Sequence, residues 1–228
     1  MHQEEHFQSS DLVRDVVIGM ADGLTVPFAL AAGLSGAVDS THIIITAGIA
    51  EIAAGSIAMG LGGYLSGRTE IEHYHSEEAR EYHEVKHFPD KERAEVKEIF
   101  ANYGLSESIQ DQIVDELERD QKQYVDFMMR YELGLEKPEP NRARNSAVTI
   151  GVSYIIGGLI PLLPYFFCSN VHTGLLVSAG VTLLALLVFG YIKSRVTGQP
   201  PLKGAIYTMV IGALAAGAAY FIASLIQS

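Results

Sequence analysis

Two carboxylates that lie inside apolar stretches are the residues of this sequence most suited to do chemistry. Asp22 lies in the run of residues 12–38, and Glu51 lies in the run of residues 43–65. An ionised carboxylate in hydrocarbon costs about 2.5 kcal/mol or more, so it persists only beside a partner, a water-filled cavity or a cation. These residues predict a site that handles a cation or a proton within a membrane.

Met59 is predicted to lie at the same membrane depth as Asp22. Asp22 is roughly 12 Å beyond Arg14, and Met59 is roughly 13 Å before Arg68 in a helix that runs the opposite way. Glu51 is deeper, at roughly 25 Å, and Asp15 shares a helix face with Asp22 at the mouth of such a path. Carboxylate plus thioether favours Fe²⁺, Co²⁺ or Zn²⁺ over Mg²⁺. Two facing copies would supply four ligands, which predicts a homodimer.

Five apolar segments must hold these residues. They meet the length of about 20 residues that a bilayer requires, at roughly 14–38, 42–67, 146–168, 171–192 and 203–226. The expected fold is an all-α polytopic membrane protein with five transmembrane helices. Outside the polar insert, Lys and Arg occur at the N-terminal edge, at the insert edges and in the loop between the last two segments. The positive-inside rule therefore places the N-terminus and the insert in the cytoplasm and the C-terminus on the other side.

The whole net charge of −11 belongs to the insert between the second and third apolar segments. Residues 70–139 hold 20 acidic and 9 basic residues, and the remainder holds seven of each. Helix signals predict that the second span continues to His87, followed by helices at about 90–102 and 107–133. The predicted organisation is residues 1–68 in the membrane part, residues 69–141 as a cytoplasmic three-helix domain, and residues 142–228 again in the membrane. No nucleic-acid partner is expected of this acidic chain.

Glutamates in the insert recur at a spacing of three residues, as in Glu81 with Glu84 and Glu92 with Glu95. Like charges at this spacing weaken a helix, and a bound cation would reverse that effect. Further along, Met128, Met129 and Glu132 repeat the pairing of soft and hard ligands. A solvated acidic surface and a methionine-containing core are the alternative interpretations.

Three Glu-x-x-His sequences keep a membrane ferroxidase open as an alternative. They begin at Glu70, Glu72 and Glu84 and match the spacing of ferritin-like di-iron helices. That geometry needs the motif on two separate helices, whereas all three copies fall on one predicted helix. A phosphate-binding loop is absent from the sequence, so nothing supports ATP-driven pumping.

Two long stretches resemble the first- and second-helix signatures of the vacuolar iron transporters. They are Asp22-Gly-Leu-Thr-Val-Pro-Phe-Ala-Leu-Ala-Ala-Gly-Leu34 and Glu51-Ile-Ala-Ala-Gly-Ser-Ile-Ala-Met-Gly-Leu-Gly-Gly-Tyr-Leu65. The resemblance covers nearly the whole chain, including the five-helix layout with an insert, and is closest to the plant vacuolar proteins.

The resemblance implies a homodimer in the vacuolar membrane that exports cytosolic Fe²⁺ into the vacuole in exchange for protons. It implies path positions for Asp22 and Met59 and a proton- and metal-linked role for Glu51. It also implies a cytoplasmic metal-binding set of Glu81, Glu84, Glu92, Glu95, Met128, Met129 and Glu132. On this interpretation the chain is a transporter and not an enzyme.

Two other classes remain as alternatives to a transporter. One is a membrane-anchored metal-sensing or metal-binding module, and the other is the ferroxidase. Within transport, Mn²⁺ is the competing main substrate, and Zn²⁺, Co²⁺ and Ni²⁺ are further divalent ions expected to bind. Metal flux with an opposing pH change would distinguish transport from both alternatives.

Overall fold

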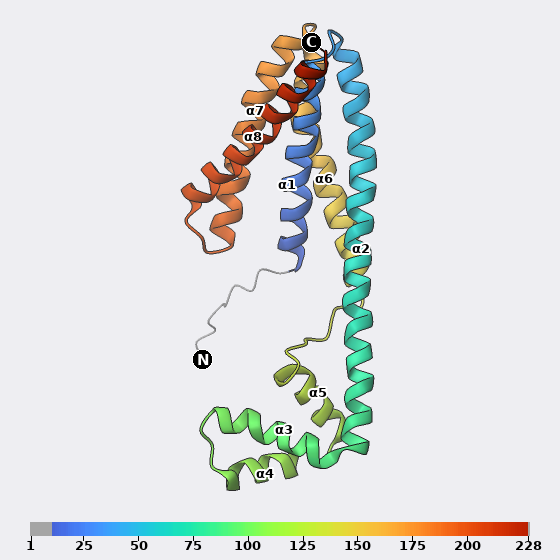
Figure 1. Ribbon diagram of the computed structural model, residues 1–228, viewed down its shortest axis with the longest axis vertical. Helices are drawn as coiled ribbons and strands as arrows, with labels where there is room; N and C mark the ends of the chain where they lie inside the picture. The colour runs from blue at the N-terminus through green and yellow to red at the C-terminus, as the bar shows by residue number, and fades with distance from the viewer. Residues whose placement is uncertain (1–10, 228) are drawn as a thin grey trace. The chain divides into compact units, whose positions relative to one another are not determined.

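The structure is a computed structural model that describes residues 11–227, a range with eight α-helices and no strand. Five of these helices are long and apolar enough to cross a membrane, which confirms the predicted all-α fold with five spans (Figure 1). They are α1 (Asp11–Ser35), α2 (Thr41–His87), α6 (Arg142–Phe167), α7 (Val171–Val196) and α8 (Pro201–Gln227). The N-terminal segment of residues 1–10, which the sequence assigns to the cytoplasmic side, lies outside the described residues.

The chain divides into two compact units. Of the described residues, 11–65 and 143–227 form one, here called the membrane unit, and residues 66–142 form the other, called the acidic unit. The boundary falls within α2, so the apolar part of that helix belongs to the membrane unit and its polar part to the acidic unit.

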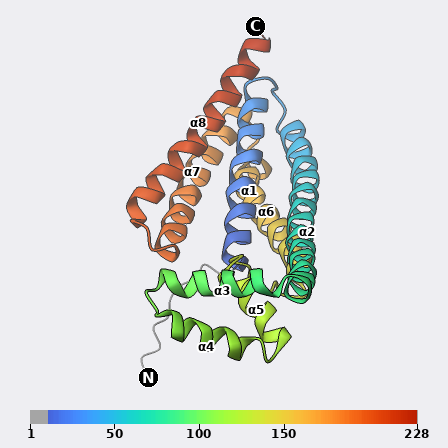
Figure 2. The same ribbon diagram turned by 60° about the horizontal axis from the view of Figure 1, so that its bottom comes forward.

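Within the membrane unit, α6 packs against both α1 and α2. At Gly158 of α6, a Cβ atom would lie 2.7 Å from Ile52 of α2 and 3.1 Å from Pro27 of α1. Small residues permit this close approach where lipid offers no hydrophobic drive for association. The antiparallel pair α7 and α8 lies side by side and contacts α1 (Figures 1 and 2). Helix α6 is therefore the element that links the two carboxylate-bearing helices.

The acidic unit consists of the polar part of α2 followed by α3 (Pro89–Asn102), α4 (Glu107–Leu117) and α5 (Gln121–Tyr131). Helices α3 and α4 run side by side (Figure 2). The apolar cores of this unit are small, and one of them joins α3, α4 and α5 through Val96, Val114, Tyr124 and Met128. The predicted break after His87 is confirmed, and so are the helix ends near Gly104 and Gly134, where positive φ angles of 77° and 64° favour glycine.

The prediction of one helix over residues 107–133 is wrong, because the structure divides this stretch into α4 and α5. Asp120 has extended backbone angles, and its side chain accepts hydrogen bonds from the backbone N–H groups of Lys122 (2.9 Å) and Gln123 (3.3 Å). This N-cap starts a new helix at Gln121. The described residues of the insert therefore form three separate helices beyond the α2 extension, not the predicted two.

Candidate functional site

A hydrogen bond from α6 holds the deep carboxylate of the membrane unit. The hydroxyl of Tyr154 donates to Oε1 of Glu51. The other oxygen, Oε2, is buried and has no hydrogen-bond partner among the described residues. A buried polar atom without a partner carries a desolvation cost. One carboxylate oxygen of Glu51 therefore has a hydrogen-bond partner in the protein, and the other is available to a proton or a cation.

Glycines on α1 and α2 let Tyr154 pass close to both carboxylate-bearing helices. A Cβ atom at Gly23 would lie 2.9 Å from Cα of Tyr154, and one at Gly55 would lie 2.6 Å from its Cζ. Gly23 follows the half-buried Asp22, and Gly55 lies one helical turn after Glu51. Tyr154 thus packs against both helices near the two carboxylates, against α1 next to Asp22 and against α2 one turn from Glu51.

The other residues predicted for the path lie on the same two helices. Met59 is half-buried on α2, and Asp15 is only 3 % exposed on α1. The shared depth of Asp22 and Met59 and the position of Asp15 at a path entrance stay predictions. Sequence reasoning missed Tyr154, since the only signal was a phenol in an apolar span 103 residues from Glu51.

In the acidic unit, three glutamates from separate segments converge. Glu81 on α2, Glu92 on α3 and Glu132 just after α5 each place one carboxylate oxygen within 4.8 Å of the others. Glu81 and Glu92 are each 1 % exposed. Among the described residues, Oε2 of Glu81 and both carboxylate oxygens of Glu92 have no hydrogen-bond partner. Converging carboxylate oxygens without partners form a candidate site for a divalent cation.

Burial and mutual repulsion keep these carboxyls protonated to a higher pH than usual. Burial, followed by the charges of Glu132 and Glu84, raises the pKa of Glu81 to about 7. Burial, followed by Glu95 and Glu81, raises the pKa of Glu92 to about 7. Glu132 is the exposed member of the group, and its pKa is also raised, by partial desolvation and then by the charge of Glu95. Protons therefore occupy part of this cluster at neutral pH, and a divalent cation would displace them.

The other two predicted glutamates are balanced by basic side chains. Nζ of Lys91 lies 3.0 Å from Oε1 of Glu95 and 3.9 Å from Oε2 of Glu84. Arg80 approaches Glu84 from the other side, at 3.8 Å through its Nε. Their charges still raise the pKa values of the central glutamates. Glu84 and Glu95 thus belong to the electrostatic surroundings of the three-carboxylate group.

The two predicted methionine ligands lie in the apolar cores. Met128 is 0 % exposed and packs with Val96 and Tyr124, while Met129 is 1 % exposed and packs with Tyr74. This packing agrees with the alternative interpretation of the sequence, a methionine-containing core. The role of the two methionines as ligands stays a prediction.

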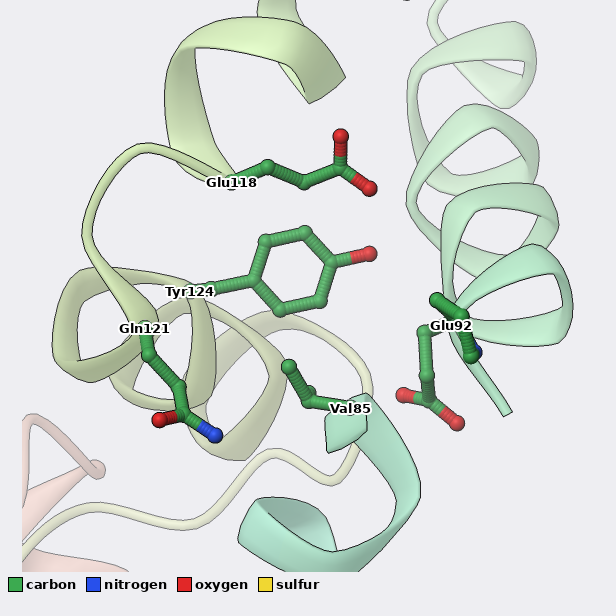
Figure 3. A pocket seen from close by; sticks show the side chains of 6 residues that line it. Val85, Glu92, Glu118, Gln121 and Tyr124 are labelled. Carbon is green, nitrogen blue, oxygen red and sulfur yellow. The ribbon is translucent and has the colours of Figure 1, made fainter. Parts of the chain in front are cut away.

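A pocket of about 290 Å³ borders the cluster at Glu92. The hydroxyl of Tyr124 and the carboxylates of Glu92 and Glu118 face the same space (Figure 3). Tyr124 is 1 % exposed, and its hydroxyl has no hydrogen-bond partner among the described residues. Sequence reasoning missed Tyr124 and Glu118. The pocket gives an ion from solvent a polar approach to the buried Glu92.

Metal affinity of the whole chain is expected to rise with pH up to about 7 and then to level off. Below that value the protons on Glu81 and Glu92 compete with the cation, so affinity should fall by about tenfold per group for each pH unit. Titration calorimetry between pH 5 and 8, in buffers of different ionisation enthalpy, measures both the affinity and the protons released. A pH-independent affinity with no proton release would contradict this expectation.

The sequence of this chain matches a family model and is similar to several known proteins. Residues 13–224 match the model of the VIT family. The chain is 55 % identical over 227 residues to Vacuolar iron transporter 1 of Oryza sativa subsp. japonica, covering 100 % of this chain and 90 % of that protein. It is 50 % identical over 226 residues to Vacuolar iron transporter 1 of Arabidopsis thaliana, covering 99 % and 90 % of the two chains. Protein CCC1 of Saccharomyces cerevisiae is 42 % identical over 232 residues, covering 96 % of this chain and 71 % of that protein.

Proposed function

The chain belongs to the VIT family, and we propose that it is a proton-coupled antiporter that moves cytosolic Fe²⁺ into the vacuole. Transport of iron at the vacuolar membrane, by a multi-pass protein that is not an enzyme, follows from family membership and the relatives' names. Proton coupling, the direction of movement and the preference for Fe²⁺ are the proposed refinements.

The proposal of proton coupling rests on the surroundings of Glu51. This residue is a carboxylate in the apolar part of α2 with one oxygen bound by Tyr154 and the other buried and unpartnered. A proton would neutralise this carboxylate, and a divalent cation would bind to it, but the two compete for the same oxygen. A proton arriving from an acidic lumen would therefore release the metal, which is the elementary requirement of exchange.

The carboxylates of the acidic unit would collect the ion before it enters the membrane unit. Glu81, Glu92 and Glu132 offer converging oxygens, and the net negative charge around them raises the local concentration of cations. Partial protonation at neutral pH keeps their hold on the metal moderate, so the ion can also leave.

A homodimer would complete the coordination within the membrane. A single Asp22 with a single Met59 supplies two ligands, whereas facing copies in two subunits would supply four, with water filling the remainder. The mixed oxygen and sulfur donors favour Fe²⁺, Co²⁺ or Zn²⁺ over Mg²⁺, and the relatives' names favour iron as the substrate. Mn²⁺ is the competing substrate, and Zn²⁺, Co²⁺ and Ni²⁺ are further ions that bind.

Reconstituted flux tests the proposed function directly. Proteoliposomes with an acidic interior should take up Fe²⁺ from outside while their interior becomes more alkaline. A series of divalent ions under the same pH gradient ranks the substrates. Metal binding without flux would favour the sensing module instead, and O₂ consumption driven by Fe²⁺ would favour the ferroxidase.

Replacing Glu81 and Glu84 together by alanine should weaken metal binding by at least about tenfold, since losing even a supporting partner of a metal ligand costs 10- to 100-fold. Uptake should fall most at low metal concentration, because the acidic unit acts by concentrating the ion. Calorimetry and flux at several Fe²⁺ concentrations measure the two effects. The pair Glu98→Ala and Glu107→Ala removes the same charge from exposed positions and should leave both unchanged. Equal losses in both double variants would point to general charge instead of the cluster.

A further inference from the structure

A cavity of about 710 Å³ opens at the turn that joins α7 to α8 in the membrane unit. Lys193 lines it from the end of α7, and Lys203 lines it from the first turn of α8. Its remaining wall includes the apolar side chains Ile206, Tyr207 and Val210 of α8, which are 55 %, 67 % and 44 % exposed. The cavity therefore combines a cationic end with an apolar side.

The positive charge of this cavity has no carboxylate near it in the sequence. Residues 140–228 contain no Asp or Glu but carry five basic residues, of which Lys193, Arg195 and Lys203 lie at this turn. Within α7, α8 and their connection, neither of the lysines that line the cavity has an acidic neighbour to neutralise it.

The helix ends at the cavity offset this charge only in part, because the partial negative charge at the end of α7 is opposed by the partial positive charge at the start of α8. The last carbonyls of α7 already accept backbone hydrogen bonds, from Thr197 to Lys193 (3.0 Å) and from Gln199 to Ser194 (2.8 Å). The lysine ammonium groups are therefore not needed as caps. Helix α8 begins at Pro201, and the N–H groups in the first turn of a helix have no intrahelical acceptor and carry partial positive charge. The start of α8 therefore adds to the positive charge that suits this cavity to an anion.

The walls of the cavity are held at a fixed spacing by close packing of α7 on α8. A Cβ atom at Gly204 would overlap Oγ of Ser194, which is 3 % exposed. Gly190 on α7 is similarly close to Thr208 on α8, with 2.7 Å from its Cβ position to the threonine hydroxyl. The cavity is thus part of the packed helix pair and not a gap between mobile segments.

We propose that this cavity binds the headgroup of an anionic phospholipid. The phosphate lies between Lys193 and Lys203, and the start of an acyl chain lies along Ile206, Tyr207 and Val210. Basic pockets between membrane helices at the cytoplasmic surface recognise anionic headgroups, and the positive-inside rule assigns this turn to the cytoplasmic surface. The apolar wall is what selects a lipid over a soluble phosphate, because a soluble anion has nothing to place there.

The chain lacks tryptophan, so Tyr207→Trp creates a single fluorescent reporter inside the cavity. The variant is reconstituted into bilayers in which either phosphatidylglycerol or phosphatidylcholine carries brominated acyl chains, which quench nearby tryptophan. Brominated phosphatidylglycerol should quench at a lower mole fraction, with a preference of about fivefold for each lysine. Adding Lys193→Gln and Lys203→Gln should bring the ratio for the two lipids close to one.

Two matched controls separate this site from general surface charge. Lys86→Gln with Lys137→Gln removes the same charge from the acidic unit and should keep the preference at Tyr207→Trp. A reporter at Leu176→Trp, a position on α7 that is 61 % exposed, should be quenched equally by both lipids. The proposal is overturned if the preference survives the loss of both cavity lysines, or if Leu176→Trp shows it equally. Relief of quenching by inorganic phosphate would overturn the lipid in favour of a soluble anion.

Discussion

Replacing Asp22 by alanine is expected to abolish Fe²⁺ uptake into proteoliposomes, with a loss of at least about 100-fold in initial rate. The residue is half-buried in α1, and its neighbour Gly23 packs on the backbone of Tyr154, whose hydroxyl binds Glu51. In the proposed homodimer both subunits lose the same ligand, so no carboxylate is left at that level. Asp22→Asn should be equally inactive, because an amide has the same shape but no charge to bind a divalent cation.

The matched control is Asp39→Ala, which removes an exposed carboxylate between α1 and α2. It should transport at the rate of the unaltered chain. Helix content by circular dichroism and elution on size exclusion confirm that the Asp22 variants still fold. An Asp22→Ala protein that folds and moves Fe²⁺ at the normal rate would contradict the assignment of Asp22 to the path.

Much of the fold could be predicted because the strongest signals in this sequence are local. Five apolar runs, the Pro89 break and the glycines at the ends of α3 and α5 act within a few residues of where they occur. The division between α4 and α5 was missed because neither glycine nor proline marks it. Asp120 alone starts α5, and an aspartate in a highly charged stretch does not stand out as a helix cap.

The candidate metal cluster was only partly predictable, because burial separates glutamates that look alike in sequence. The spacing treats Glu81, Glu84, Glu92 and Glu95 alike. In the structure Glu92 is buried, whereas Glu95 forms an ion pair with Lys91. The methionines show the same limit. A methionine side chain can bind a metal ion or fill an apolar core, and the sequence does not distinguish the two. The structure shows that Met128 packs against Val96 and Tyr124.

Replacing Glu51 by glutamine is expected to remove the dependence of flux on lumenal pH and to lower the flux by at least about tenfold. Glutamine has nearly the same shape and still accepts the hydrogen bond from Tyr154, so the packing of α2 on α6 is preserved. What it loses is the ability to take up a proton and to offer a charged oxygen to the metal. Uptake measured over a series of interior pH values should therefore be weak and flat.

Tyr154→Phe supplies the comparison that separates the carboxylate from its support. The phenyl ring keeps its contact with Gly55, and the contact of Gly23 with the backbone of residue 154 is unchanged. Glu51 loses its hydrogen-bond donor but keeps its carboxyl group. Its flux should be reduced yet still vary with interior pH, unlike that of Glu51→Gln. If both variants gave flat profiles, the hydroxyl would be as essential as the carboxylate. If Glu51→Gln kept the normal pH dependence, the exchangeable proton would have to reside elsewhere, and the half-buried Asp22 would be the next carboxylate to test.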